Sequence, residues 1–259
     1  MKDNIIEKSY RLSDISGNSS IKKLVFDIGE ADVIPGQFYM IRYNGTQKPI
    51  SVADYTSGRI SFIIQNRGCG TQKILDAQIN DIFGLIGPLG NGFNTQKSGS
   101  ALIVGGGIGI APLLYLYKQL RMNGIKSDVV FGSRNIDLIN FAIINNKSIE
   151  YFTDDGTYGS KGFVTDSKSL SGIYHKIYIC GPEKMMVAVY NKIKDKNKSI
   201  EVSMERYMKC GIGICGSCAI DGTGDRVCTE GPVFNIDSLI KTPEFGNYHR
   251  DSGGVIEYR

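Results

Sequence analysis

Four cysteines near the C-terminus constrain the possible folds of this chain more than any other feature. Three of them, Cys210, Cys215 and Cys218, follow the spacing C-x4-C-x2-C, and Cys228 follows after nine further residues. Glycine occupies three of the six other positions between Cys210 and Cys218. A short, glycine-rich loop can fold back on itself, because glycine adopts positive φ angles without a steric penalty. We therefore expect the four thiols to lie close together and to hold a common ligand.

The spacing favours an iron–sulfur cluster over other uses of clustered cysteines. C-x4-C-x2-C with a more distant fourth cysteine is a pattern by which four thiolates hold a [2Fe-2S] cluster. A structural zinc site usually draws on two short C-x2–4-C pairs, and here the second pair is missing. A zinc-bearing binding module nevertheless stays open as an alternative of another class. Disulfides fit less well, since the N-terminus shows no secretory signal and six cysteines in 259 residues is ordinary usage. A cytoplasmic, reducing location is expected.

Length and charge narrow the function classes. A chain of 259 residues is long enough for two domains and a small appendage. Its net charge of +4 is mild and its lysines are scattered, so the sequence shows no electrostatic footprint for nucleic acid. Residues 98–117 carry no charge, but five glycines after residue 98 and Pro112 break this stretch into strand, loop and helix. We therefore expect no membrane span there.

The first part of the chain, residues 1–97, has the pattern of a small antiparallel β-barrel. Short apolar stretches recur at residues 23–27, 37–41 and 60–64. Turn signals such as Asn44-Gly45 and Ser57-Gly58 separate strands. Strands at this spacing without intervening helices favour an all-β barrel.

Strands and helices alternate in the second part, residues 98–202. Strands are expected at residues 101–104, 128–131 and 176–180, and helices at residues 111–121 and 183–194. This alternation predicts a parallel sheet covered on both faces. The remaining part, residues 203–259, is rich in glycine and cysteine and is expected to form the cluster module.

Two motifs of the α/β part suggest a nucleotide site. Residues 105–112, Gly-Gly-Gly-Ile-Gly-Ile-Ala-Pro, follow a strand and open a helix, which directs backbone N–H groups toward a phosphate. A tight packing turn without a ligand would look similar. Cys180-Gly181-Pro182 lies at the carboxyl end of a strand, the edge where open α/β sheets bind ligands, although a buried cysteine before a turn is an equal reading.

Two weaker motifs lie in the barrel. Lys48-Pro-Ile-Ser51 presents a cation and a hydroxyl on an apolar strand, and residues 68–71 present a backbone nest for an anion. Each motif alone is more often a structural feature than a site.

Taken together, the motifs resemble those of the ferredoxin-NADP reductase superfamily, in which a barrel binds FAD and an α/β domain binds a nicotinamide nucleotide. The cysteine module narrows the resemblance to the electron-transfer subunits of two-subunit, NAD-linked dihydroorotate dehydrogenases, over nearly the whole chain. The residues that carry it are 35–38, 48–51, 87–90, 105–112, 153–156, 159–165, 205–218 and 227–234. The implied fold is a barrel domain, a parallel-sheet domain and a small [2Fe-2S] module.

The resemblance also implies roles for individual residues. FAD would be bound by Lys48, Pro49, Ile50, Ser51, Ile63, Ile64, Gln65, Gly70 and Thr71. The nicotinamide nucleotide would be bound by Gly105, Gly106, Gly107, Gly109, Cys180 and Gly181. The superfamily commonly has arginine at the position of Lys48, and lysine keeps the charge but loses the bidentate fork. Cys69 is assigned no redox role. No catalytic acid or base is expected, and His175 and His249 are expected at the surface.

The implied function is electron transfer from NADH through FAD and the cluster to the FMN of a dihydroorotate dehydrogenase catalytic subunit, in pyrimidine biosynthesis. A flavin is needed between the two, because NADH gives up two electrons as hydride and the cluster accepts one. The expected assembly is a heterotetramer with two copies of each subunit. A diaphorase-type subunit of a sulfhydrogenase or of a ferredoxin-NADP transhydrogenase remains an alternative, since those proteins share the domain order. No acidic residue clearly ends the second strand, and Ser133-Arg134 could tolerate the 2′-phosphate of NADPH. The preference for NADH over NADPH is therefore implied by the resemblance alone.

Overall fold

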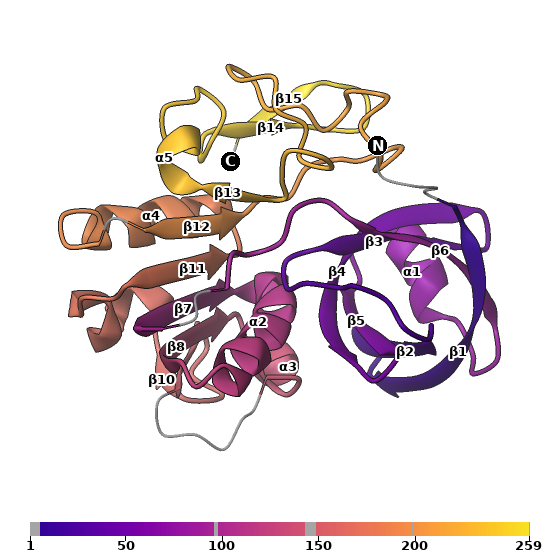
Figure 1. Ribbon diagram of the computed structural model, residues 1–259, viewed down its shortest axis with the longest axis horizontal. Helices are drawn as coiled ribbons and strands as arrows, with labels where there is room; N and C mark the ends of the chain where they lie inside the picture. The colour runs from indigo at the N-terminus through magenta and orange to yellow at the C-terminus, as the bar shows by residue number, and fades with distance from the viewer. Residues whose placement is uncertain (1–5, 96–97, 143–148, 198, 259) are drawn as a thin grey trace.

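The computed structural model describes residues 6–95, 98–142, 149–197 and 199–258. A closed barrel and a seven-stranded sheet lie side by side, and the C-terminal segment lies across both of them (Figure 1). The antiparallel barrel and the parallel-sheet domain predicted from the sequence are both confirmed. The domain limits at residues 97 and 202 stay predictions.

Six antiparallel strands close the barrel in the order β1-β2-β5-β4-β3-β6. These are β1 (Lys8–Gly17), β2 (Ile21–Asp27), β3 (Phe38–Tyr43), β4 (Thr46–Thr56), β5 (Arg59–Gln65) and β6 (Ile82–Leu89). Asn44 and Gly45 both have positive φ in the turn between β3 and β4. Such a turn matches the twist of the two strands that it joins. Inside the barrel, the ring of Phe26 packs edge-on against Phe62 and Phe83 at centroid distances of 6.1 and 5.1 Å.

The barrel region contains one helix that the sequence did not predict. Helix α1 (Cys69–Leu75) begins directly after Gly68, whose φ is 127°. Ile74 and Leu75 are buried at the end of the barrel. The apolar pair at the end of this short segment therefore stabilises a helical turn where only an all-β pattern was expected.

The sheet has the strand order β10-β9-β8-β7-β11-β12-β13. Its strands are β7 (Ser100–Gly106), β8 (Lys126–Ser133), β9 (Ile149–Thr153), β10 (Ser160–Lys161), β11 (Lys176–Cys180), β12 (Ile200–Ser203) and β13 (Val233–Asn235). All neighbours pair in parallel except β12 and β13. The last strand therefore comes from the C-terminal segment, which shares the sheet with the α/β part.

Helices cover both faces of the sheet, as a parallel sheet requires. The helices and turns here are η1 (Gly107–Gly109), α2 (Ile110–Met122), α3 (Ile136–Ile139), η2 (Val164–Asp166), η3 (Lys168–Ser171) and α4 (Glu183–Ile193). The α2 residue Leu116 packs with Ala101 and Ile103 on one face, and Val189 of α4 packs with Leu102 on the other. The uncharged residues 98–117 span β7, η1 and part of α2. Among the described residues, no helix is long and apolar enough to cross a membrane.

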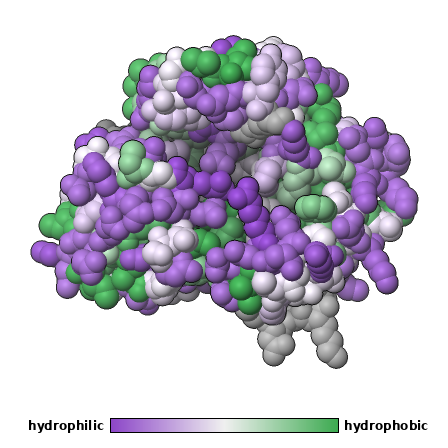
Figure 2. Space-filling model, turned by 180° about the vertical axis from the view of Figure 1, so that it is seen from behind, coloured by the Kyte–Doolittle hydropathy of each residue, from purple (hydrophilic) through white to green (hydrophobic). Residues whose placement is uncertain are grey.

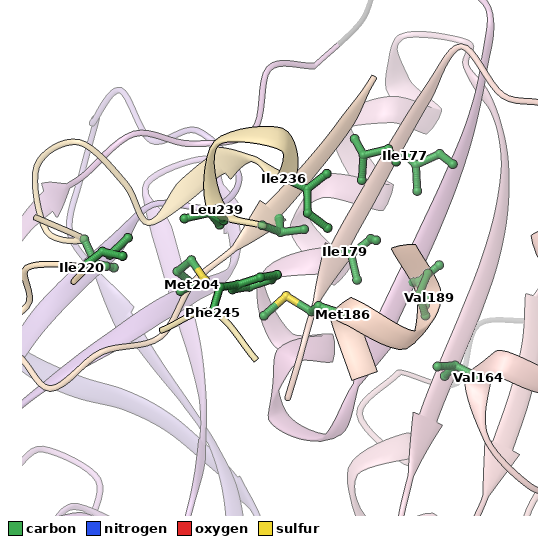
Figure 3. Close-up of a cluster of buried hydrophobic side chains, with 14 of the residues drawn as sticks. Val164, Ile177, Ile179, Met186, Val189, Met204, Ile220, Ile236, Leu239 and Phe245 are labelled. Atoms are coloured by element: carbon green, nitrogen blue, oxygen red, sulfur yellow. The ribbon is translucent and has the colours of Figure 1, made fainter. Parts of the chain in front are cut away.

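The C-terminal segment has little regular structure and is held by apolar contacts with the sheet. It contains β13, α5 (Ile236–Leu239), β14 (Tyr248–Arg250) and β15 (Ile256–Tyr258). Figure 3 shows Ile236, Leu239 and Phe245 of this segment beside Met186 of α4 and Ile179 of β11, all within one buried cluster. These contacts fix the position of the segment that carries the four cysteines.

Candidate cofactor and cluster site

One cavity of about 960 Å³ lies where the barrel, the sheet and the C-terminal segment meet. Seen from behind, the surface is hollowed below the C-terminal segment (Figure 2). Three walls enclose the cavity: a barrel wall, a nucleotide wall at the carboxyl edge of β7 and β11, and a C-terminal wall. All the predicted cofactor residues line the cavity except Gly105.

The barrel wall brings together the two weak barrel motifs. Lys48 to Ser51 lie on β4, Ile63 to Gln65 on β5, and Gly70 and Thr71 in α1. A Cβ atom on Gly70 would lie 2.6 Å from Cε of Lys48, so the missing side chain leaves room for the lysine stem. The side-chain oxygen Oε1 of Gln65 is buried and has no hydrogen-bond partner among the described residues. Buried acceptors are normally paired, so this wall offers an open hydrogen-bonding position to a ligand.

The nucleotide wall consists of the glycine turn after β7 and the loop after β11. Gly106, Gly107 and Gly109 line the cavity, and a Cβ on Gly109 would meet the backbone of Cys180 at 2.5 Å. Gly105 instead lies within β7, where a side chain would collide with Phe131. Packing against Phe131 therefore explains why residue 105 is glycine. Gly105 does not line the cavity, so the nucleotide contact expected of it stays a prediction.

Cys180 is the last residue of β11 and lines the nucleotide wall, and its thiol is protonated at neutral pH. Burial raises the pKa of Cys180 to about 12. The thiol therefore contributes shape and polarity to the cavity, and it is not set up as a thiolate nucleophile.

The C-terminal wall was missed in the sequence. Residues 203–208 and 249–251 line the cavity opposite the glycine turn. His249, which was expected at the surface, belongs to this wall and pairs with Glu257 at 3.1 Å. Arg250 of the same strand is held by Asp221 at 2.8 Å. Residues 205–208 belong to a run that carries the family resemblance, but no motif predicted that they line the cavity, because they reach it only through the fold of the last sixty residues.

The four cysteines come together in two pairs. Cys210 is among the groups that lower the pKa of Cys215, and Cys218 is among those that raise the pKa of Cys228, so the thiols of each pair are close enough to influence one another. Cys215 is exposed and Cys210 is half-buried, whereas Cys218 and Cys228 are buried. Among the described residues, no three Cys, His, Asp or Glu side chains form a group that could hold a single metal ion.

The two pairs also differ electrostatically. A hydrogen bond with the Ser217 hydroxyl, 3.1 Å away, lowers the pKa of Cys215 to about 6. Burial, with the neighbouring Cys218 thiol, raises the pKa of Cys228 to about 12. The Cys215 thiol therefore favours the thiolate form, whereas the Cys228 thiol needs a nearby positive charge before it becomes anionic.

Contacts with the barrel hold the cysteine loop. A Cβ on Gly211 would meet Met40 of β3, so the loop backbone packs directly on the barrel. The Asn91 side chain donates to the carbonyls of Thr229 and Glu230 at 3.1 and 3.0 Å. On the far side, Arg226 donates to the carbonyl of Gly213 at 2.6 Å. The loop is therefore fixed relative to the barrel wall of the cavity.

Comparison with known proteins agrees with this geometry. Residues 205–240 match the family model described as the iron-sulfur cluster binding domain of dihydroorotate dehydrogenase B. The chain is 36% identical over 250 residues to the protein of Methanothermobacter thermautotrophicus named "Probable dihydroorotate dehydrogenase B (NAD(+)), electron transfer subunit", covering 93% of this chain and 92% of that one. It is 35% identical over 247 residues to the dihydroorotate dehydrogenase B (NAD(+)) electron transfer subunit of Clostridium acetobutylicum, covering 91% and 99% of the two chains.

The chain belongs to the family of dihydroorotate dehydrogenase B electron transfer subunits.

Solved structures support the fold of this electron transfer subunit. An NADH-dependent reduced ferredoxin-NADP oxidoreductase superposes with a TM-score of 0.76 at 26% identity, covering 93% of this chain and 94% of the other. Phthalate dioxygenase reductase superposes with a TM-score of 0.62 at 16% identity, covering 77% and 69% of the two chains, and shows the fold alone. The ferredoxin-reductase-like fold predicted from the sequence is confirmed.

Proposed function

We propose that this electron transfer subunit takes electrons from NADH and passes them, through FAD and a [2Fe-2S] cluster, to the FMN of a dihydroorotate dehydrogenase catalytic subunit in pyrimidine biosynthesis. One observation carries the proposal: a single cavity joins the barrel motif, the glycine turn and a wall that leads to the cysteines. Met208 lines this cavity, and Cys210 follows two residues later.

FAD fits the barrel wall. Lys48 would meet the pyrophosphate with its ammonium group, beside the space left by Gly70. Ser51 and Thr71 offer hydroxyl groups, and the buried Oε1 of Gln65 offers an acceptor for an N–H donor. Bound there, FAD would accept a hydride and release electrons singly. The other proposed FAD residues, Pro49, Ile50, Ile63 and Ile64, supply the apolar surface.

The nicotinamide nucleotide fits the opposite wall. The glycine turn leaves Gly106, Gly107 and Gly109 without side chains where a phosphate would approach, and Cys180 and Gly181 border the same space. The cavity is large enough for the reacting parts of both molecules to meet. The chain's task at this step is to align the two groups and to exclude water, since hydride transfer needs no acid or base from the protein.

A [2Fe-2S] cluster fits the donor set of the cysteines. The thiols of Cys210, Cys215, Cys218 and Cys228 would hold the cluster, and the influence of Cys210 on Cys215 and of Cys218 on Cys228 supports their acting together. Iron would supply a positive charge that favours ionisation of the buried Cys228 thiol. Bound there, the cluster would carry one electron at a time.

The outer edge of the cysteine loop is proposed as the face toward the FMN subunit. Ile214, between the second and third glycines of the loop, is 79% exposed and precedes the exposed Cys215. An apolar side chain beside an exposed ligand suits a covered interface, because electron transfer requires close approach. We further propose a cytoplasmic heterotetramer with two copies of each subunit.

The test is reduction of the partner. The isolated subunit with its cofactors should reduce an artificial acceptor with NADH and should not oxidise dihydroorotate. Mixed with the FMN-containing dihydroorotate dehydrogenase of its own organism, it should form a stable complex in which NADH reduces the FMN. No complex with that enzyme, together with a productive complex with a sulfhydrogenase or transhydrogenase partner, would move the assignment to those alternatives.

A further inference from the structure

Three charged side chains lie buried beside the cavity. The guanidinium of Arg206 donates a hydrogen bond to a carboxylate oxygen of Glu183 through Nη1, and its Nε lies 2.6 Å from Oε1 of Glu244 in an ion pair without hydrogen-bond geometry. The side chains of Arg206, Glu183 and Glu244 are 3%, 1% and 1% exposed. Arg206 and Glu183 both line the cavity.

Each member of this buried triad belongs to a different part of the site. Glu183 begins α4, immediately after the Cys180–Pro182 loop of the nucleotide wall. Arg206 lies in the C-terminal wall, between β12 and the cysteine loop. Glu244 comes from the segment between α5 and β14. The triad therefore ties the nucleotide wall to the segment that carries the cysteines.

Backbone groups hold the carboxylates from the other side. Glu183 accepts a hydrogen bond from the amide of Gly246 at 2.8 Å, and Glu244 accepts one from the amide of Asp221 at 2.7 Å. Asp221 in turn binds Arg250 of the C-terminal wall. The contacts thus run without a break from the loop before α4 to the strand β14.

Stability alone does not account for such an arrangement. Burying charges carries a desolvation penalty, and well-packed apolar side chains of similar volume often serve stability as well or better. A guanidinium can do something that apolar contacts cannot: Arg206 bonds directionally to Glu183 and attracts Glu244 by charge, so it restrains the relative placement of two carboxylates on different segments.

We propose that Arg206 is a positioning residue for hydride transfer. It holds the Cys180–Pro182 loop, and with it the nicotinamide end of NADH, at the distance from the barrel wall that hydride transfer to FAD requires. The proposal rests on the proposed function. Reacting atoms must approach to about 3–3.5 Å, and a misplacement of about 1 Å can lower a rate about a hundredfold.

The main test is the variant Arg206→Lys, which keeps the positive charge but offers one ammonium group in place of the forked guanidinium. The control is Arg59→Lys, the same exchange in an exposed ion pair with Asp27 on the barrel surface. Glu244→Gln is a second, milder variant, which keeps an acceptor for Asp221 and leaves the Arg206–Glu183 contact in place. All three are studied as full chains loaded with FAD and cluster.

Two measurements are made on each variant. Stopped-flow absorbance gives the rate of flavin reduction per bound FAD at saturating NADH. Hydrogen exchange without NADH gives the protection of residues 180–186 and of the Gly246 amide. Arg206→Lys should reduce the flavin about tenfold to a hundredfold more slowly and exchange faster in both segments. Glu244→Gln should show a smaller change of the same sign, and Arg59→Lys should match the wild type.

A different outcome would overturn the proposal. If Arg206→Lys and Glu244→Gln reduce bound FAD at the wild-type rate, even with faster hydrogen exchange, Arg206 has a merely structural role. This failure is separate from a failure of the proposed function, in which the wild-type chain itself would not bind FAD or would not be reduced by NADH.

Discussion

The two pairs of cysteines have the same chemistry but different surroundings. Cys218 and Cys228 are each 2% exposed and belong to the main apolar core, together with Phe38 and Met40 of the barrel. Cys215 is exposed, and its neighbour Ile214 points to solvent. The inner pair is therefore part of the fold, and the outer pair is part of the surface. A cluster bound there would have one side against the apolar core and another side toward solvent, which is the side we propose for the partner.

The comparison predicts that replacing an inner cysteine destabilises the apoprotein more than replacing an outer cysteine. Alanine at any of the four positions should abolish the visible absorption and the reduced-state EPR signal of the cluster. Cys228→Ala should in addition destabilise the apoprotein by about 1–3 kcal/mol, because it removes a buried side chain from the core. Cys215→Ala should leave apoprotein stability within about 0.5 kcal/mol of the wild type. Urea unfolding of the apoproteins measures this, and equal losses for both variants would contradict the distinction.

The open side of the cluster is tested at Ile214. Ile214→Asp places a charge at the centre of the proposed interface, and we expect about tenfold or greater weakening of the complex with the FMN subunit. NADH-dependent reduction of an artificial acceptor should stay unchanged. Ile173→Asp is the matched control, since Ile173 is 76% exposed and lies before β11. Titration of the partner by calorimetry gives both affinities, and equal affinities would place the interface elsewhere.

The barrel wall is tested at Lys48. Lys48→Met removes the cation but keeps a similar stem against Gly70, and it should weaken FAD binding about tenfold, as expected for the loss of one charged hydrogen bond. Lys48→Arg should retain FAD at least as well as Lys48→Met does. Fluorescence titration of the apoprotein with FAD measures the affinities. Unchanged affinity in Lys48→Met would remove the proposed pyrophosphate contact.

The smallest expected effect concerns pH and the C-terminal wall. Hydrogen bonds from Arg250 hold the pKa of Asp221 below its usual range. A lowered carboxyl pKa stabilises the folded state above the unfolded value of about 3.9, and the contribution is lost as the pH falls through the lowered value. Asp221→Asn should therefore melt slightly below the wild type at pH 6, and the gap should narrow below about pH 4. Thermal unfolding at both pH values measures the gap, and a constant gap would assign it to another cause.

Local signals in the sequence were enough for some parts of the site. The C-x4-C-x2-C spacing identified the candidate cluster cysteines, whose role stays a prediction, and the glycine turn after residue 104 predicted one edge of the sheet. The C-terminal wall gave no such signal. Arg206 meets Glu183 across 23 positions, and Glu183 meets the amide of Gly246 across 63. Contacts of this kind depend on how β13 joins the sheet, and neither periodicity nor turn residues encode that pairing.

Helix α1 shows the same limit on a smaller scale. Gly68 to Thr71 were read as a nest on a barrel loop, and the chain there forms a helix whose buried end is Ile74 and Leu75. A short segment that starts at a glycine and ends in two apolar residues can form a turn, a strand or a helix. The packing of Ile74 and Leu75 against the barrel core is what stabilises the helix here. The place of His249 beside the cavity could not be predicted for the same reason, since it depends on the pairing of β14 with β15, and its side chain stays 32% exposed.

The central claim is that the four cysteines hold a [2Fe-2S] cluster that NADH can reduce through the flavin. The most direct measurement is iron, sulfide and flavin analysis of the anaerobically purified chain, followed by EPR after addition of NADH. We expect about two irons, two sulfides and one FAD per chain, and a cluster EPR signal that appears with NADH and is absent in Cys215→Ala. One zinc ion without sulfide, or a cluster that dithionite reduces and NADH does not, would contradict this account.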